Sequence, residues 1–127
     1  MDIVRLGIVG VGTMGSAHAR YLLDGAIKRV KLVALADIDP AAMAPYTDLL
    51  RFDSAPALIQ SGAVDAVLIA TPHYAHTTIG ILALKHGLHV LVEKPISVHK
   101  ADCRRLIAAH TNKKLVFAAM FNQRTDP

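Results

Sequence analysis

The 127-residue chain has a single cysteine, Cys103, and no apolar run as long as a membrane span. One thiol cannot form an internal disulfide, and nothing near Cys103 matches a metal or redox motif, which favours a buried or half-buried thiol in a helix. A membrane helix needs about 18 consecutive apolar residues, and the N-terminus lacks the charged region and cleavage site of a signal peptide. We therefore expect a soluble, cytoplasmic protein without a membrane partner.

Aromatic residues are few, with three tyrosines, three phenylalanines and no tryptophan. The formal net charge of +4 invites a nucleic-acid interpretation, but the basic residues are scattered over expected helix surfaces and turns. A nucleic-acid interface is typically a basic stripe with interleaved aromatic side chains. We interpret these charges as solvated faces that mildly favour anionic ligands, and we expect no nucleic-acid partner.

Hydrophobic residues make up 53% of the chain, which fits a sheet covered on both faces. Apolar runs alternate with helical spacing, and no linker or repeat interrupts the alternation. Strands are expected at residues 3–9, 30–36, 51–53, 64–70, 88–92 and 115–120, and helices at 13–24, from 39 to about 45, and at 55–60, 73–86 and 98–110. Such short crossovers permit only parallel neighbours. The fold class is therefore α/β, a single three-layer Rossmann domain over residues 1–127 with a doubly wound parallel six-stranded sheet.

Local signals refine these helices. Asp39 followed by Pro40 predicts a helix start, with Asp as the cap and Pro in the first turn, and Ser54 predicts another cap. In the first helix, four residues share one face at i, i+3 and i+4 spacing. That face comprises Met14, Ala17, Tyr21 and Leu22.

The first expected strand runs into Gly10-Val11-Gly12-Thr13-Met14-Gly15, which has the G-x-G-x-x-G spacing of dinucleotide-binding loops. Gly10 permits a tight turn, Gly12 lets the backbone approach a pyrophosphate, and Gly15 lets the helix pack against the strand. The helix that begins near Thr13 directs unpaired N–H groups and a positive dipole end at the phosphates. We predict that all six loop residues bind the cofactor.

Asp37 ends the second apolar run about 20 residues after Gly15, where dinucleotide-binding folds place the carboxylate that accepts ribose hydroxyls. This carboxylate would repel a 2′-phosphate, and the next residue, Ile38, is not an arginine that could accept one. We therefore expect NAD as the cofactor in preference to NADP. Asp37 could also simply cap the next turn, although Asp39 is better placed to do so.

Ligands of a doubly wound sheet bind beyond the carboxyl ends of its strands. The residues after five of the expected strands are polar or rich in glycine, and we expect them to converge on one ligand site. They are Gly10 to Gly15, Asp37-Ile38, Thr71-Pro72-His73, Glu93-Lys94-Pro95 and Phe121-Asn122-Gln123.

Five motifs, in their order and spacing, resemble the amino-terminal domain of the glucose–fructose oxidoreductase, inositol dehydrogenase and rhizopine-catabolism family. The resemblance covers essentially the whole chain, and its most specific part is Glu-Lys-Pro after the fifth strand. The motifs are Gly10 to Gly15, Ala36-Asp37-Ile38-Asp39-Pro40, Ala70-Thr71-Pro72-His73-x-x-His76, Val92-Glu93-Lys94-Pro95 and Phe121-Asn122-Gln123-Arg124.

The resemblance implies an enzyme that uses NAD or NADP to oxidise or reduce a hydroxyl or carbonyl carbon of a sugar, inositol or related small molecule. The family's catalytic lysine corresponds to Lys94, near the nicotinamide and the reacting oxygen, where an amine can assist proton transfer. Pro95 shapes the backbone close to the nicotinamide. The remaining predicted cofactor positions are Thr71, Pro72, His73, His76, Glu93, Asn122 and Gln123.

Family members continue into a second, mostly antiparallel domain that supplies an Asp and a His to the substrate pocket and forms the dimer interface. The resemblance therefore implies a truncated chain that lacks the substrate and dimerisation domain, and a homo-oligomeric full-length protein with a polyol or sugar substrate. A non-catalytic NAD-binding sensor or corepressor-like module is the alternative. Lys94 within Glu-Lys-Pro favours the enzyme, because a sensor needs no amine at the nicotinamide.

Several site residues also have plainer interpretations. Without the resemblance, Lys94 could equally be an ordinary surface lysine. His73 and His76 could suggest a metal pair, but no third ligand lies near in sequence, so a helix-start cap or a cofactor contact is favoured and no metal is expected. The other histidines are assigned to helix ends and surfaces without chemistry; they are His18, His86, His89, His99 and His110.

Overall fold

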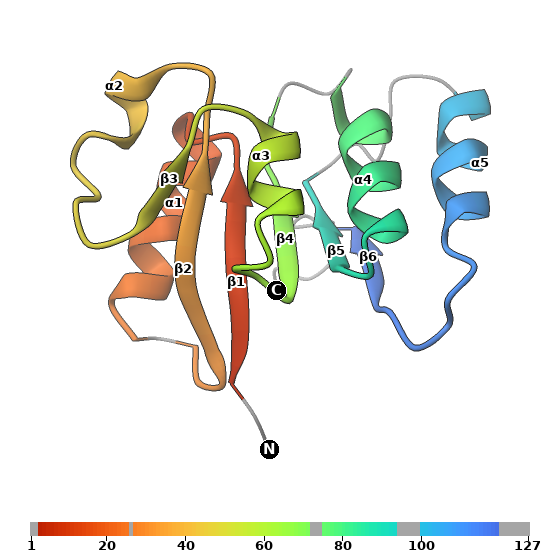
Figure 1. Ribbon diagram of the computed structural model, residues 1–127, viewed down its shortest axis with the longest axis horizontal. Helices are drawn as coiled ribbons and strands as arrows, with labels where there is room; N and C mark the ends of the chain where they lie inside the picture. Colours follow the sequence, from red (N-terminus) through yellow and green to blue (C-terminus); the bar gives the residue numbers. More distant parts are fainter. Residues whose placement is uncertain (1–2, 26, 72–74, 94–99, 120–127) are drawn as a thin grey trace, which may run out of the picture.

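The structure is a computed structural model that describes residues 3–25, 27–71, 75–93 and 100–119. Its six strands form one sheet in the order β3-β2-β1-β4-β5-β6, with every neighbouring pair parallel. This order and the alternation of strands and helices confirm the doubly wound Rossmann sheet (Figure 1). The strands are β1 (Val4–Val9), β2 (Val30–Ala36), β3 (Leu50–Phe52), β4 (Ala66–Ile69), β5 (His89–Val92) and β6 (Phe117–Ala119).

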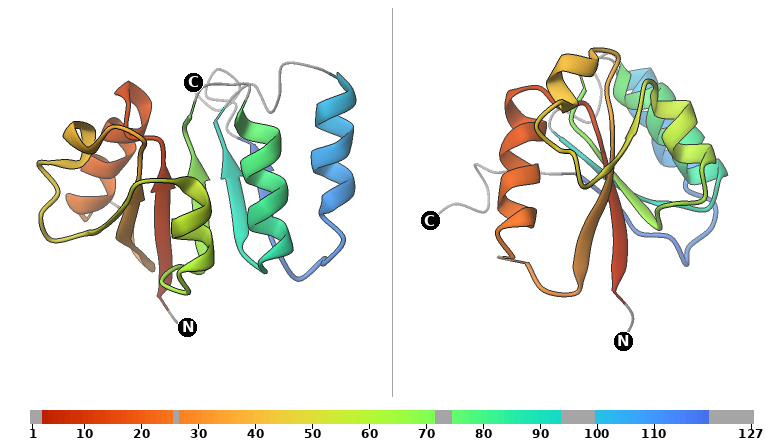
Figure 2. Two further views of the ribbon diagram at one scale, coloured as in Figure 1. Left: turned by 45° about the horizontal axis from the view of Figure 1, so that its top comes forward. Right: turned by 60° about the vertical axis from the view of Figure 1, so that its left-hand side comes forward.

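Helices cover both faces of the sheet, which confirms the three layers. Figure 2 shows α1 (Thr13–Leu23) and α2 (Pro40–Met43) on one face, and three helices on the other. These three are α3 (Ala55–Gln60), α4 (His76–Lys85) and α5 (Lys100–Ala109). The expected 73–86 and 98–110 helices begin in segments outside the described residues, so only their later parts can be compared.

Two apolar clusters form the core because neighbouring residues of a strand point to opposite faces. Ile8 packs with Met43 and Ala19 in the cluster beneath α1 and α2. The next residue, Val9, belongs to the larger cluster with Leu106 of α5. The central strands therefore read as continuous apolar runs in the sequence, as a sheet buried on both faces requires.

The predicted helix caps are confirmed. Asp39 Oδ1 accepts a hydrogen bond of 3.0 Å from the Ala41 N–H at the start of α2, and Pro40 occupies the first turn. Ser54 Oγ accepts one of 3.2 Å from the Ala57 N–H at the start of α3. Both side chains satisfy N–H groups that the helix itself leaves unpaired.

Two residues of the apolar face predicted for α1 do not pack against the sheet. Met14 and Tyr21 are 44% and 59% exposed, whereas Gly15 and Ala19 are buried against the sheet. A Cβ added at Gly15 would stand 1.8 Å from the carbonyl oxygen of Gly10, so the helix lies too close for larger side chains along this line. Small residues form the contact, which confirms the packing predicted at Gly15, whereas the apolar spacing gave no sign of Ala19.

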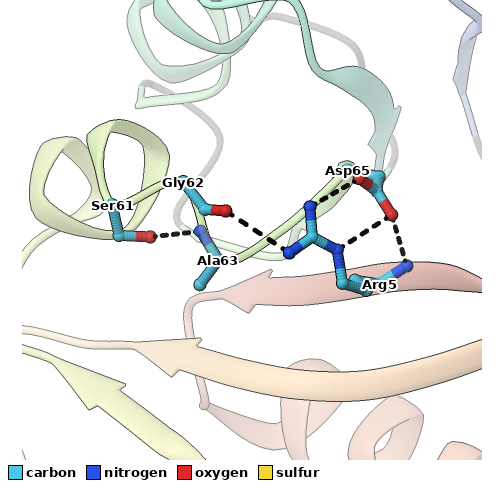
Figure 3. A network of polar contacts seen from close by, with 5 residues as sticks. All are labelled: Arg5, Ser61, Gly62, Ala63 and Asp65. Carbon is cyan, nitrogen blue, oxygen red and sulfur yellow. Dashed lines mark hydrogen bonds and ion pairs between the residues drawn. The ribbon is translucent and has the colours of Figure 1, made fainter.

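A network of polar contacts links β1 to the segment before β4, at the edge of the sheet opposite the carboxyl ends of the strands (Figure 3). Arg5 Nη2 lies 2.9 Å from Asp65 Oδ1, and the Arg5 backbone N–H donates to Asp65 Oδ2 over 2.9 Å. Arg5 Nη1 also donates to the Gly62 carbonyl at 3.4 Å. The guanidinium of Arg5 lowers the pKa of the Asp65 carboxyl below its usual 3.8, first through the side-chain hydrogen bond.

Candidate dinucleotide site at the carboxyl ends of the strands

The loop after β1 is packed between the ends of β2 and β4. The Gly10 N–H donates to the Ala36 carbonyl over 2.8 Å. Gly10 has a φ of +93°, and an added Cβ would lie 2.8 Å from the carbonyl carbon of Ala70 and from the nitrogen of Thr71. This position therefore needs glycine both for its backbone conformation and for the close approach of the neighbouring chain.

Gly12 is different, because it faces open space. It is the N-terminal cap residue of α1, and no side-chain hydrogen bond caps that end. A Cβ added at Gly12 would have no heavy atom within 4 Å. The first N–H groups of a helix have no partner within the helix, and they carry the positive end of its dipole. The structure therefore leaves room at Gly12 for an anionic group such as a pyrophosphate.

Asp37 follows β2 and reaches the same loop. Its Oδ2 accepts a 2.7 Å hydrogen bond from the Val11 N–H, and its Oδ1 accepts a 2.8 Å bond from the Asp39 N–H. A carboxylate has about four acceptor sites, so both oxygens keep capacity for ribose hydroxyls. Asp37 does stabilise the following turn, as its plainer interpretation holds, while Asp39 caps α2. Ile38, the next residue in the sequence, has a side chain that is 89% exposed.

A cavity of about 250 Å³ lies between the ends of β1, β2 and β4, and its lining includes Gly10, Asp37, Ile38, Thr71 and Ile79. The Thr71 Oγ1 atom is buried, and it has no hydrogen-bond partner among the described residues. A buried hydroxyl without a partner is unusual in a folded protein, and a bound ligand can supply one. The cavity is therefore lined both by Asp37, a hydrogen-bond acceptor, and by Thr71, whose buried hydroxyl has no partner among the described residues.

His76 is the first residue of α4. Its ring is fully buried, and its Nε2–H donates to the Thr71 carbonyl over 2.9 Å. The N-terminal cap residue of α4 is Ala75, with no side-chain cap bond. His76 therefore anchors the segment after β4 from within the fold. Direct cofactor contacts by Thr71 and His76 stay predictions.

Glu93, the residue after β5, is buried at 6% exposure. Its Oε1 pairs with Nε2 of His18, which comes from the middle of α1 and is partly buried. The placement of His18 at a helix end or surface was wrong, because it lies within α1 and is partly buried against Glu93. A periodic signal could have found it, because His18 falls three residues after Gly15 and four before Leu22, on the side of α1 that meets the sheet.

Other histidines also hold the fold together. The ring of His86 donates from Nδ1 to the Leu82 carbonyl over 2.9 Å at the end of α4. His89 lies in β5, and its Nδ1 accepts a hydrogen bond of 2.9 Å from the Val116 N–H. The His110 Nε2–H donates to the Leu115 carbonyl near the end of α5. His89 was thus assigned wrongly to a helix end or surface, since it links β5 to the chain entering β6.

Several predicted site residues lie outside the described residues, so their placement stays a prediction. They are Pro72, His73, Lys94, Pro95, Asn122 and Gln123, together with His99 of the plainer assignments. Over the described ranges, no group of three or more His, Cys, Asp or Glu side chains could hold a metal ion. In the same ranges, no helix has both the length and the apolar character to cross a membrane.

The structure brings four predicted strand ends to one edge of the sheet: the glycine loop, Asp37, Thr71 and Glu93. The sequence model of a family described as "Oxidoreductase family, NAD-binding Rossmann fold" matches residues 4–121. The chain belongs to this oxidoreductase family. The match confirms the resemblance, and it agrees with the open α1 N-terminus and the anchored carboxylate of Asp37.

Members of the oxidoreductase family are similar to this chain throughout its length. Inositol 2-dehydrogenase 1 of Saccharopolyspora erythraea is 35% identical over 130 residues, covering 98% of this chain and 38% of that protein. A crystal structure of scyllo-inositol dehydrogenase from Lactobacillus casei, with bound NAD(H) and scyllo-inositol, matches with a TM-score of 0.86 and 30% identity, covering 98% of this chain and 38% of the other. Myo-inositol 2-dehydrogenase from Lactobacillus plantarum matches with a TM-score of 0.90 and 26% identity at the same coverage. The chain thus spans less than two fifths of these relatives.

Proposed function

We propose that this chain is the cofactor-holding part of an NAD-dependent dehydrogenase that acts on a hydroxyl or carbonyl carbon of an inositol, a sugar or a related polyol. The observation that carries the proposal is the juxtaposition of the open α1 N-terminus at Gly12 with the Asp37 carboxylate, which is bonded to the loop at Val11. One element suits a pyrophosphate and the other suits ribose hydroxyls. Both lie at the strand ends where such folds bind ligands.

The described residues fit NAD, and each has a distinct task. The N–H groups at the start of α1 bind the phosphates, and Gly12 admits them because it has no Cβ. Asp37 accepts from the ribose, and Thr71, a residue of the cavity lining, has a buried hydroxyl whose missing partner a bound group can supply. When bound, NAD supplies the carbon that accepts or donates hydride. The protein's role is to hold that group and to exclude competing orientations.

Lys94 is the proposed proton-handling residue. It follows the buried Glu93 directly in the sequence. An amine near the reacting oxygen can accept or return the hydroxyl proton while hydride moves, and such assistance typically contributes about 10²- to 10⁴-fold in rate. The assignment rests on the resemblance of Val92-Glu93-Lys94-Pro95 to the family's Glu-Lys-Pro motif, which gives the lysine its position in the chain.

The substrate class is proposed from the relatives, because this chain covers only 38% of their length. We propose that groups outside these 127 residues orient the polyol and build the contact between protomers of a homo-oligomer. The cofactor end of the site is then supplied by this chain, and substrate choice is supplied elsewhere. We propose this division because the described site residues lie at the carboxyl ends of the strands, where such folds bind their cofactor.

NADH fluorescence tests the proposed function. Titration of the chain with NADH should give saturable binding that NAD and ADP-ribose both displace, since the described contacts are to phosphates and ribose. Myo-inositol alone should not displace the cofactor. Absence of saturable NADH binding, or binding that ADP-ribose cannot displace, would contradict the proposal.

A further inference from the structure

We propose that His18 is a positioning residue for the segment that carries Lys94, and that it acts through the Glu93 carboxylate. The inference rests on the proposed function, because it assigns Lys94 a role at the cofactor. It goes beyond that function by giving a task to a helix residue outside the glycine loop and outside Glu-Lys-Pro. Three features of the described residues support it.

The first feature is the burial of a carboxylate. Glu93 is 6% exposed, and its Oε1 meets the His18 ring nitrogen Nε2. Removing a carboxylate from water is costly unless a hydrogen-bonding partner replaces the solvent. His18 supplies that partner. The direction of the Glu93 side chain is therefore set by α1 and not by solvent.

The second feature is that Glu93 is held at two points. Its backbone N–H donates to the Ile69 carbonyl over 2.9 Å, which extends the pairing of β5 with β4. Its side chain meets His18 on the α1 side of the sheet. A residue fixed by both its backbone and its side chain gives a defined starting point to the next residue, which is Lys94.

The third feature is the position of His18 within α1. It lies on the same helix whose N-terminus is open at Gly12, five residues after Thr13. At about 1.5 Å per residue, the ring is attached roughly 7 to 8 Å along the helix from its first residue. The pair therefore ties the helix that is proposed to hold the phosphates to the strand end that precedes the proposed catalytic lysine.

A packing role for the ring is the competing explanation. His18 also borders an apolar groove of about 320 Å³, together with Tyr21, Leu22 and Leu91. The two roles need different properties of the side chain. Packing needs the volume of a ring, whereas positioning needs an N–H that donates to the carboxylate of Glu93.

Two variants separate these properties. His18→Phe keeps a ring and removes the donor, and His18→Gln keeps an N–H donor and removes the ring. The measured signal is that of Lys94 in a chain with ¹³C-methylated lysines, assigned by its disappearance in Lys94→Arg. We expect His18→Phe to move the Lys94 signal of the free chain and to abolish its response to NADH. His18→Gln should restore both toward wild type.

The matched control is His86→Phe, which removes a ring donor bonded to the Leu82 carbonyl at the far end of α4. It should leave the Lys94 signal and its NADH response unchanged. If His18→Phe fails to fold because Glu93 is left buried and unpaired, the double variant His18→Phe with Glu93→Gln removes the charge. That double variant should fold and still show the displaced Lys94 signal.

An unchanged Lys94 signal in His18→Phe would overturn the inference. If the signal is at the same time displaced in His18→Gln, the ring of His18 serves packing. The proposed function fails separately, when the wild-type chain shows no saturable NADH binding. In that case the comparison of free chains still decides whether His18 positions the Lys94 segment.

Discussion

Asp37 and Val11 are joined by a 2.7 Å hydrogen bond, in which the Val11 N–H donates to the carboxylate oxygen Oδ2. The acid that is proposed to bind the ribose therefore also holds the loop that is proposed to bind the phosphates. Substitutions of Asp37 act on both functions, so a test of cofactor preference needs a control variant that keeps the loop contact. Asn keeps an acceptor oxygen at this position without the charge.

We predict that the chain prefers NADH to NADPH, because Asp37 would face the 2′-phosphate of NADPH. Like charges brought together cost several kcal/mol, and about 1.4 kcal/mol is already tenfold in affinity. Fluorescence titration should therefore give at least about tenfold tighter binding of NADH. The double variant Asp37→Ser with Ile38→Arg should reverse the preference, because an arginine can accept the phosphate.

Asp37→Asn is the control for this prediction. It should reduce the discrimination by removing the repulsion. Its amide oxygen can still accept from the Val11 N–H, while the Asp39 N–H loses its acceptor. Equal or tighter binding of NADPH by the wild-type chain would show that Asp37 does not read the 2′ position.

Two glycine substitutions should have opposite consequences. Gly12→Val places a branched side chain where Gly12 now faces open space, so the apo melting temperature should change little while stabilisation by NAD is lost. Gly15→Ala forces a Cβ to 1.8 Å from the Gly10 carbonyl oxygen. That overpacking should cost about 1–3 kcal/mol of folding stability or more.

Thermal melting with and without NAD checks both variants. A Gly12→Val protein that NAD still stabilises would place the phosphates elsewhere. A Gly15→Ala protein as stable as wild type would show that the α1 contact relaxes easily.

We predict that these 127 residues bind cofactor without useful turnover. Orientation of a substrate against a reacting partner can supply about 7–11 kcal/mol of a barrier, and the groups that orient substrate are proposed to lie outside this chain. In its proposed role, Lys94 alone would contribute only acid–base assistance, about 10²- to 10⁴-fold. A panel of polyols, inositols and sugar acids with NAD should show no saturable formation of NADH. Saturable turnover that Lys94→Ala abolishes would show a complete active site within the chain.

The Arg5–Asp65 contact should add a small amount to the free energy of unfolding, and acid should remove that contribution. Arg5 lowers the pKa of Asp65 in the folded state, so the contribution is present above 3.8 and is lost as the pH falls through the depressed value. The effect should be small, because the two side chains are 50% and 41% exposed and solvent screens them. Chemical unfolding from pH 6 to pH 2 should show a shallower acid loss in Asp65→Asn.

Arg5→Gln is the matched variant for the Arg5–Asp65 contact. It removes the guanidinium but keeps the backbone N–H that donates to Asp65 Oδ2 over 2.9 Å. Its acid loss should therefore lie between those of wild type and Asp65→Asn. Identical acid profiles for wild type and Asp65→Asn would contradict the predicted contribution.

The sequence alone determined the parallel sheet, the helix caps and the glycine loop, because each depends on local chemistry. Buried strands read as apolar runs, Asp39 and Ser54 cap the helices that directly follow them, and the loop glycines recur at a known spacing. Family membership was recognisable for the same reason, since the motifs follow one another in the chain in a fixed order. Lys94 was assigned from that resemblance, and its role stays a prediction.

Only the tertiary structure decided which side chains meet across the chain. Asp37 bonds to Val11, and Glu93 pairs with His18, which lies 75 residues earlier in the sequence. The close packing of α1 at Gly15 was predicted from the loop motif, but the burial of Ala19 beside it was not, because hydrophobic periodicity gives weight to large residues. A contact line is set by how closely two backbones approach, and pairing partners are set by the stacking of strands, so neither can be read from one segment alone.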